Sequence, residues 1–225
     1  MVAAPRASGT DCTPSFIVVE GPIGIGKTAL ARRLADAFQS DLVLESAQDN
    51  PFLERFYRDR KSHALPLQLF FLFQRAQQIE VLRQEDLFSP VRVADFLIDK
   101  DRLFAEINLD QEERDLYEQI YAKLEIDAPK PDLVVYLQAP ADVLISRLQA
   151  RGNPHEQQIE RGYIEQVAER YASFFYAYDD SPLLIVNAAS IDPVNNDVDF
   201  NALFEQISTI RSGRHFFNPV AAAIG

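Results

Sequence analysis

Eight residues near the start of the chain form a pattern that can hold a row of phosphates. Residues 21–28 read GPIGIGKT, which matches G-x-x-x-x-G-K-[ST] between a buried run and a helical run. The glycines at Gly21, Gly24 and Gly26 let backbone N–H groups approach phosphate oxygens, and the helix that follows presents its positive end to them. Lys27 reaches the terminal phosphates, and the Thr28 hydroxyl is a ligand for Mg²⁺. The pattern predicts ATP or GTP with Mg²⁺, but it does not define the reaction.

The reaction depends on what surrounds this loop. The guanine-reading element N-K-x-D of signalling GTPases occurs nowhere in the sequence, which disfavours that class. A small-molecule kinase needs a base near the acceptor hydroxyl and a cationic segment that closes over the transferred phosphate. Glu45 ends a predicted strand and is expected beside the loop as that base, if the second strand neighbours the first. A solvated strand-end carboxylate would have the same sequence pattern.

Three further residues carry charge where phosphate transfer needs it. Asp95 closes the third predicted strand, where such folds keep a carboxylate for the water shell of Mg²⁺. Arg147 and Arg151 lie four residues apart on one helix face, and Arg151 leads into a break at Gly152. They predict a short arginine lid over about 151–158, with a solvated helix face as the alternative.

The elements that must position these residues alternate along the chain. Strands are predicted at 16–20, 42–45, 91–95, 132–138 and 181–187. Helices are predicted at 27–39, 51–61, 66–85, 140–150, 159–178 and 200–211, with helical segments over 100–124. This alternation specifies an α/β fold with a five-stranded parallel sheet covered on both faces, whose ligands bind at the carboxyl ends of the strands.

Composition limits the setting in which such a protein works. The 225 residues are 47% hydrophobic and carry a formal charge of -12, which supplies a sizeable core and opposes binding to a nucleic-acid polymer. No run approaches the roughly 20 apolar residues of a membrane helix. The single cysteine, Cys12, suits a reducing compartment, so a cytoplasmic protein is expected. Residues 1–14 are expected to be disordered, 15–212 to form one domain, and 213–225 to be an apolar tail that docks or dimerises.

Taken together, the segments resemble the deoxynucleoside kinase family, which includes deoxycytidine, deoxyguanosine and bacterial deoxyadenosine kinases. The resemblance covers nearly the whole globular part. It rests on the order of GPIGIGKT, LES with DNPFLERFY, LPLQLFFLFQR, DFLIDKDRLFAEINL, SRLQARGNPHEQ and LLIVN. It implies a three-layer nucleoside-kinase fold, transfer of phosphate from ATP to the 5′-hydroxyl of a deoxynucleoside in nucleotide salvage, and a homodimer built through long helices. It also implies that the adenine of ATP lies against residues 188–199.

The resemblance assigns roles to individual side chains on the acceptor side. Glu45 matches the acidic residue that takes the proton from the 5′-hydroxyl. Tyr57 matches a residue that contacts the sugar, and Glu156 matches the lid glutamate that binds its 3′-hydroxyl. Gln68 matches the residue that reads the base, which suits an amide because it donates and accepts at once. Phe71 either packs on the plane of the base or belongs to the core.

Arg75 and Asp101 match an ion pair that, in the cytidine and purine kinases of this family, faces the exocyclic group of the base. Thymidine-preferring relatives usually lack this pair. Because a buried pair is costly unless it is fully hydrogen-bonded, its presence indicates specificity rather than stability. A purine deoxynucleoside is therefore favoured, with deoxyadenosine, deoxyguanosine and deoxycytidine all left open.

Two departures from the family pattern concern the transferred phosphate. Many members carry Glu-Arg-Ser after the third strand, where this chain has Asp-Phe-Leu at 95–97, so an arginine is absent at Phe96. In the lid, Asn153 stands in place of another arginine. Arg147 and Arg151 are expected to compensate for the arginine that is absent at Phe96.

Two other functions are compatible with the phosphate loop. A kinase of nucleoside monophosphates, of the thymidylate type, shares the fold and has an Asp-Arg motif similar to Asp101-Arg102. A scaffold that binds ATP without transferring phosphate would retain the loop alone. An assay on deoxynucleosides and their monophosphates separates all three.

Overall fold

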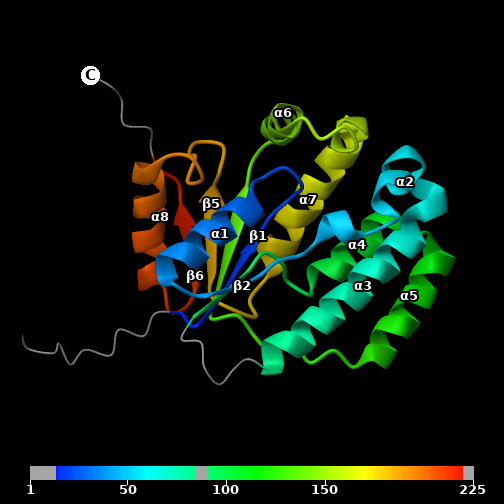
Figure 1. The fold of residues 1–225 in the computed structure, drawn as a ribbon, viewed down its shortest axis with the longest axis horizontal. Coiled ribbons are helices and arrows are strands. Elements are labelled where there is room, and N and C mark those ends of the chain that lie inside the picture. The colour runs from blue at the N-terminus through cyan, green and yellow to red at the C-terminus, as the bar shows by residue number, and fades with distance from the viewer. Residues whose placement is uncertain (1–13, 85–90, 220–225) are drawn as a thin grey trace, which may run out of the picture.

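A single parallel sheet forms the centre of the molecule, which is described by a computed structural model over residues 14–84 and 91–219 (Figure 1). Cys12 lies outside the described residues. The strands are β1 (Phe16–Glu20), β2 (Asp41–Val43), β3 (Arg92–Ala94), β4 (Leu133–Gln138), β5 (Leu183–Asn187) and β6 (Arg214–Phe217). They lie in the order β2-β3-β1-β4-β5-β6, and every neighbouring pair is parallel. All carboxyl ends therefore meet at one edge.

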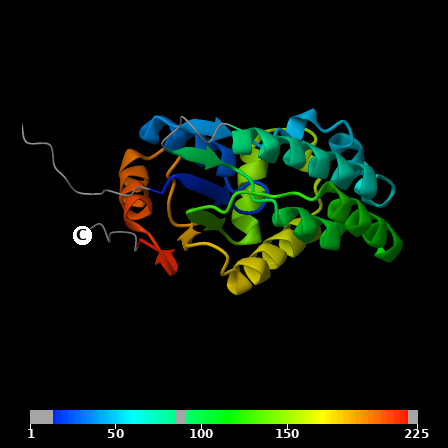
Figure 2. The ribbon, with the colours of Figure 1, turned by 90° about the horizontal axis from the view of Figure 1, so that it is seen from below.

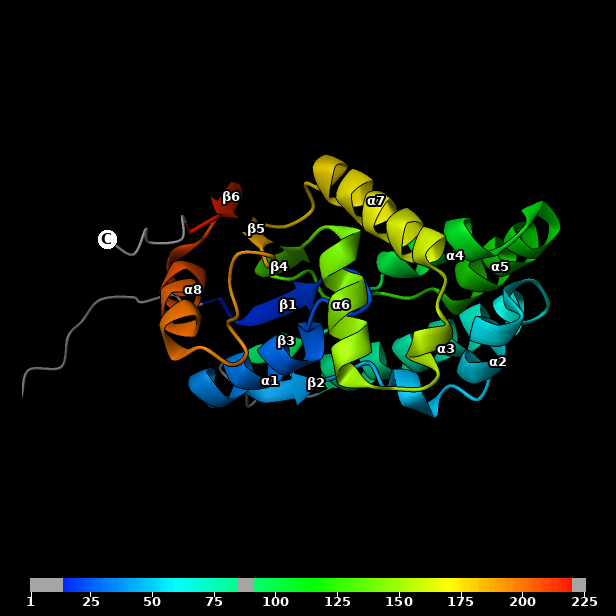
Figure 3. The ribbon, with the colours of Figure 1, turned by 90° about the horizontal axis from the view of Figure 1, so that it is seen from above.

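Helices cover both faces of the sheet (Figures 2 and 3). They are α1 (Lys27–Phe38), α2 (Leu53–Arg58), α3 (Arg60–Gln84), α4 (Lys100–Asn108), α5 (Gln111–Leu124), α6 (Ala141–Arg151), α7 (Arg161–Ala177) and α8 (Asp197–Thr209). Ile17 and Val19 pack with α1 and α8, whereas Val18 packs with α3, α4 and α7. This alternation along β1 is the period of two expected of a strand covered on both sides. Within the described residues, no helix is both long and apolar enough to span a bilayer.

The predicted α/β fold with a parallel sheet is confirmed, but the number of strands is six rather than five. The additional strand, β6, comes from residues that the sequence assigned to a tail. It pairs only with β5, and its four residues alternate between exposed and half-buried. A four-residue edge strand gives too short a pattern to separate from an irregular tail.

The order of the strands also differs from the expectation. Because β3 lies between β1 and β2, the second strand does not neighbour the first. β2 also ends at Val43, so Glu45 lies in the loop beyond it. The Glu45 backbone N–H is nevertheless held by the Asp95 carboxylate at 2.6 Å, which brings Glu45 to the end of the neighbouring strand.

The helices that border the acceptor side differ in their boundaries from the prediction. α2 ends at Arg58, and α3 begins at Arg60 and continues through Pro66 as one helix, rather than starting there. Asp59 has extended backbone angles, and its carboxylate accepts a hydrogen bond from the Ser62 N–H at 3.2 Å. A side-chain cap of this kind starts the second helix at Arg60, within the segment predicted to belong to the first.

Candidate active site

The loop between β1 and α1 has the backbone that a phosphate cradle requires. Gly21, Gly24 and Gly26 have φ angles of 152°, 83° and 100°. Side chains rarely adopt such angles, so glycine is needed for the loop to close. Lys27 begins α1, and its ammonium donates to the Pro22 carbonyl at 3.3 Å. Burial, and after it the charge of Lys100, lowers the pKa of this ammonium.

Gly21→Ala is expected to damage both stability and nucleotide binding. A Cβ there would lie 2.5 Å from the Leu137 carbonyl oxygen, a backbone atom that cannot turn aside. With the positive φ, we expect a loss of roughly 1–3 kcal/mol in the free energy of unfolding. Chemical denaturation and ATP titration measure the two effects. Gly162→Ala is the matched control, because a Cβ added at Gly162 would have no other atom within 4 Å. Unchanged ATP binding in Gly21→Ala would contradict the prediction.

The two side chains predicted to bind Mg²⁺, Thr28 and Asp95, lie next to this loop. The Thr28 hydroxyl donates to the Asp95 carboxylate at 2.5 Å, so the residues predicted to serve Mg²⁺ are in contact. Within the described residues, no group of three or more His, Cys, Asp or Glu is placed to hold a metal. A hydroxyl and a carboxylate fit Mg²⁺, which commonly takes its remaining ligands from phosphate oxygens and water.

A second cluster of charges lies beside the loop, on α3 and α4. Arg75 donates one nitrogen to Glu45 and another to Asp101, and all three side chains are mostly buried. Asp101 also accepts from the Gln68 amide at 2.5 Å and from the Tyr117 hydroxyl at 2.8 Å. The predicted Arg75–Asp101 pair is therefore formed, and Gln68 belongs to the same network. Such sharing offsets part of the cost of burying the charges.

Glu45 is the point at which this cluster meets the phosphate loop. Burial alone would raise the pKa of its carboxyl, but Arg75, Lys100 and Lys27 outweigh burial and lower the pKa to about 2. Glu45 is therefore ionised at neutral pH. Phe71 lies partly buried against the core, and the Arg75 guanidinium is 5.0 Å from the centre of its ring. These contacts are compatible with Phe71 packing on the base and with Phe71 belonging to the core.

The sugar-contacting residues of the prediction come together from α2 and the lid. α6 ends where Gly152 adopts a φ of 71°, and a short 3₁₀ helix, Glu156–Gln158, follows. Glu156 accepts from Arg151 at 3.1 and 3.3 Å. Burial, followed by Tyr163 and Glu156, raises the pKa of the Tyr57 phenol well above its usual range. Tyr57 therefore lies near Glu156.

Arg147 is bound to backbone on the donor side. It donates to the Ile25 carbonyl at 3.1 Å and to the Ala188 carbonyl at 2.6 Å. It therefore joins the phosphate loop to residues 188–199, the segment expected to hold adenine. Arg33 fixes the same segment through the Val194 carbonyl at 2.9 Å. Figure 3 shows α6, which carries Arg147 and Arg151, crossing over the carboxyl edge of the sheet.

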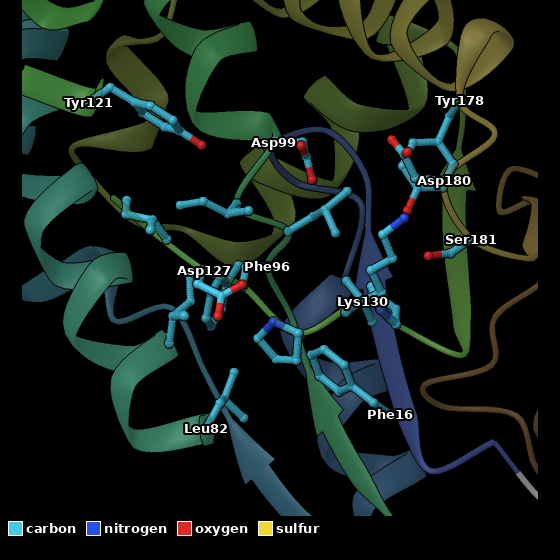
Figure 4. A pocket seen from close by; sticks show the side chains of 18 residues that line it. Phe16, Leu82, Phe96, Asp99, Tyr121, Asp127, Lys130, Tyr178, Asp180 and Ser181 are labelled. Atoms are coloured by element: carbon cyan, nitrogen blue, oxygen red, sulfur yellow. The ribbon is translucent and has the colours of Figure 1, made fainter. Parts of the chain in front are cut away.

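The Phe96 side chain lies away from the charged groups at the carboxyl ends of the strands. It is 3% exposed and lies on the wall of a separate cavity of about 310 Å³ (Figure 4). Phe16 and Val18, from the first half of β1, line the same cavity. The side chain at position 96 is thus part of the core.

Two charged residues in the centre of the site were not identified from the sequence. Glu20 is the fully buried last residue of β1, and Lys100, the first residue of α4, is 2% exposed. The Lys100 ammonium lies 2.8 Å from the Glu45 carboxylate and 3.3 Å from that of Glu20. One signal was available: a carboxylate inside the otherwise apolar run FIVVE must be paired if the strand is buried.

Comparison with known proteins points to one family. Residues 17–211 match the family described as "Deoxynucleoside kinase". The deoxyguanosine kinase of Bacillus subtilis is 35% identical over 88% of this chain and 98% of its own length, and that of Lactobacillus acidophilus is 32% identical over 86% and 89%. The Bacillus subtilis deoxyadenosine/deoxycytidine kinase is 27% identical over 87% and 93%. A deoxyadenosine kinase structure from M. mycoides with bound dATP shares the fold, with a TM-score of 0.75 at 23% identity over 87% of this chain and 100% of that one.

Proposed function

Because this chain belongs to the deoxynucleoside kinase family, we propose that it transfers the γ-phosphoryl group of ATP to the 5′-hydroxyl of a purine deoxynucleoside in nucleotide salvage, with deoxyguanosine preferred. One observation carries the proposal. The buried Glu45–Arg75–Asp101 cluster lies directly beside the phosphate loop, so a base reader and a proton acceptor adjoin the donor site.

The preference for deoxyguanosine is supported by an unused donor. Arg75 Nε is buried and has no hydrogen-bond partner among the described residues. Both oxygens of Asp101 are already engaged, and its side chain is fully buried. The cluster therefore offers a donor, which suits the O6 and N7 acceptors of guanine better than the amino group of adenine or cytosine. The two relatives of highest identity named above are both deoxyguanosine kinases.

The chemistry follows from the charge of Glu45. As a carboxylate, it accepts a hydrogen bond from the 5′-hydroxyl and orients that oxygen toward the γ-phosphorus. The new O–P bond forms as the bond to the β-phosphate oxygen breaks, ADP leaves, and the hydroxyl proton passes to Glu45. A carboxyl with a pKa near 2 is a weak base, so it takes the proton late, when the attacking oxygen is already bonded to phosphorus.

The donor side is assembled from the phosphate loop and the lid. Lys27 neutralises the terminal phosphates, and Arg151 adds charge from the lid above the sugar. Thr28 and Asp95 would hold Mg²⁺, which supplies charge neutralisation on the phosphate oxygens when it is bound. Residues 188–199, anchored by Arg147 and Arg33, hold the adenine. With ATP as the donor, the proposal places the enzyme in the cytoplasm.

The proposal includes a homodimer that uses the outer surfaces of α3 and α5. Phe73 and Val81 on α3 are each 47% exposed, and Leu116 on α5 is 45% exposed. Large apolar side chains at this exposure are suited to cover by a second copy of the chain.

Initial rates over a panel of acceptors test the function. We expect phosphorylation of deoxyguanosine and, more slowly, of deoxyadenosine and deoxycytidine, with little on thymidine and none on the monophosphates. Deoxyinosine, which keeps O6 and N7 but lacks the 2-amino group, should approach deoxyguanosine. Transfer to monophosphates alone would indicate the thymidylate type of kinase, and ATP binding without transfer would indicate a scaffold. A deoxyadenosine rate above that of deoxyinosine would refute the assignment of Arg75 as the discriminating donor.

A further inference from the structure

The position of the Lys100 ammonium is electrostatically unfavourable apart from its contacts with two carboxylates of the site. Lys100 is the first residue of α4, where the positive end of the helix dipole repels its ammonium. Its side chain is only 3% exposed, which adds the cost of removing the charge from water. Burial would lower the pKa of this ammonium, but Glu20 and Glu45 outweigh burial and raise the pKa. Lys100 therefore stays charged because two carboxylates surround it.

Glu20 fixes the other side of this contact. One of its oxygens accepts from the Gly21 N–H at 3.0 Å and from the Tyr171 hydroxyl at 3.2 Å. The other accepts from the Leu97 N–H at 2.8 Å and lies 3.3 Å from Lys100. Glu20 thus joins the first glycine of the phosphate loop to the segment after β3. Lys100 continues this connection from the phosphate loop to Glu45.

Lys100 supplies one of the three positive charges that stand close to the buried carboxylates of this region. Three carboxylates, Glu20, Glu45 and Asp101, stand against three cations, Lys27, Lys100 and Arg75. Asp95 remains for the metal side through its contact with Thr28. Among the described residues, removing Lys100 would leave Glu45 with Arg75 as its ion-pair partner and would leave Glu20 with backbone and hydroxyl donors.

The other cations near the phosphates are engaged elsewhere. Arg147 is bound to two backbone carbonyls, and Arg151 is paired with Glu156. The side chain at position 96 is an apolar part of the core. Lys100 is therefore the buried cation that joins the proton acceptor to the phosphate loop.

We propose that Lys100 is a positioning residue for phosphoryl transfer: it holds the Glu45 carboxylate at the phosphate loop, and Glu20 holds Lys100 in turn. The inference rests on the proposed role of Glu45. With one oxygen bound to Arg75 and the other to Lys100, the Glu45 carboxylate has one orientation. Its remaining lone pairs then face the acceptor hydroxyl. Without Lys100 the carboxylate can rotate about its bond to Arg75, which lowers the fraction of complexes ready to react.

Steady-state kinetics of Lys100→Met and Lys100→Arg in the full chain test this role. We expect Lys100→Met to lower kcat by about 100-fold while the KM for ATP changes by less than about threefold, because positioning affects the reacting complex more than binding. Lys100→Arg should recover at least about tenfold of the loss, since it restores a cation between the two carboxylates. Lys123→Met, on an exposed part of α5, is the matched control and should leave kcat unchanged.

A double variant separates positioning from folding. Glu20→Gln with Lys100→Met removes both charges together, so it avoids an uncompensated buried carboxylate. The amide oxygen of the glutamine can still accept from the Gly21 N–H, so the kcat of the double variant should match that of Lys100→Met within about threefold. The inference is overturned if Lys100→Met turns over normally, if Lys100→Arg recovers nothing, or if the loss lies wholly in KM. If the wild type transfers no phosphate, or if Glu45→Gln stays active, both this inference and the proposed function are wrong. If Glu45→Gln is inactive but Lys100→Met stays active, only the inference about Lys100 is wrong.

Discussion

Glu45→Gln is expected to lower kcat by about 10²–10⁴-fold, the range found when a general base is removed. The amide keeps the size of the side chain but carries no charge and cannot take the hydroxyl proton. The fold should survive, because Arg75 retains Asp101 and Lys100 retains Glu20. ATP affinity should change little, since the proposed phosphate contacts come from Lys27 and the glycine backbone.

The measurement is single-turnover transfer from labelled ATP to deoxyguanosine, combined with ATP titration of the same protein. Glu112→Gln is the matched control, because Glu112 is exposed near the start of α5. A Glu45→Gln rate within tenfold of the wild type would show that another group accepts the proton. Loss of ATP binding would show that the substitution disturbs the phosphate loop instead.

Arg75→Met is expected to produce the largest loss of stability. It leaves Asp101, which is fully buried, and Glu45 without their shared guanidinium. Breaking one side of a buried ion pair costs about 3–5 kcal/mol, which corresponds to a fall of roughly 6–20 °C in Tm for a chain of this size. Deoxynucleoside phosphorylation should fall as well, because the base loses its reader.

Chemical denaturation in the absence of nucleoside measures this loss. Arg58→Met is the surface control, because Arg58 is 61% exposed in its pair with Glu54 and such pairs contribute at most about 1 kcal/mol. Combining Arg75→Met with Asp101→Asn removes both charges and should recover part of the stability but none of the base preference. A loss below about 1 kcal/mol in Arg75→Met alone would mean that water or rearrangement compensates the carboxylates.

Local sequence patterns predicted the strand and the helix that flank the phosphate loop. The glycines, Lys27 and Thr28 are close in sequence, and the structure places the glycines between β1 and α1, with Lys27 and Thr28 at the start of α1. The α/β fold follows from the alternation of strands and helices, and the family likeness identified the Arg75–Asp101 contact. The roles of Glu45, Tyr57, Gln68 and Glu156 remain predictions, although the structure brings them to one region.

The features that were missed depend on contacts between distant segments. Strand order is decided by how the elements pack, so nothing within residues 41–45 indicates that β3 separates β2 from β1. Lys100 looks like a solvent-facing residue at the start of a helix, and only its distances to Glu20 and Glu45 identify it as part of the site. A partner far away in sequence leaves no local periodicity to detect.

The position of β6 has a practical consequence for work with this protein. Residues 214–217 protect the outer edge of β5, whose sequence LLIVN is apolar and whose Leu183 N–H is bonded to the Gly213 carbonyl at 3.0 Å. A chain shortened to residue 212 would expose a row of unpaired backbone groups on an aggregation-prone strand. Affinity tags at this end therefore belong beyond residue 219, and a soluble preparation depends on keeping residues 213–217.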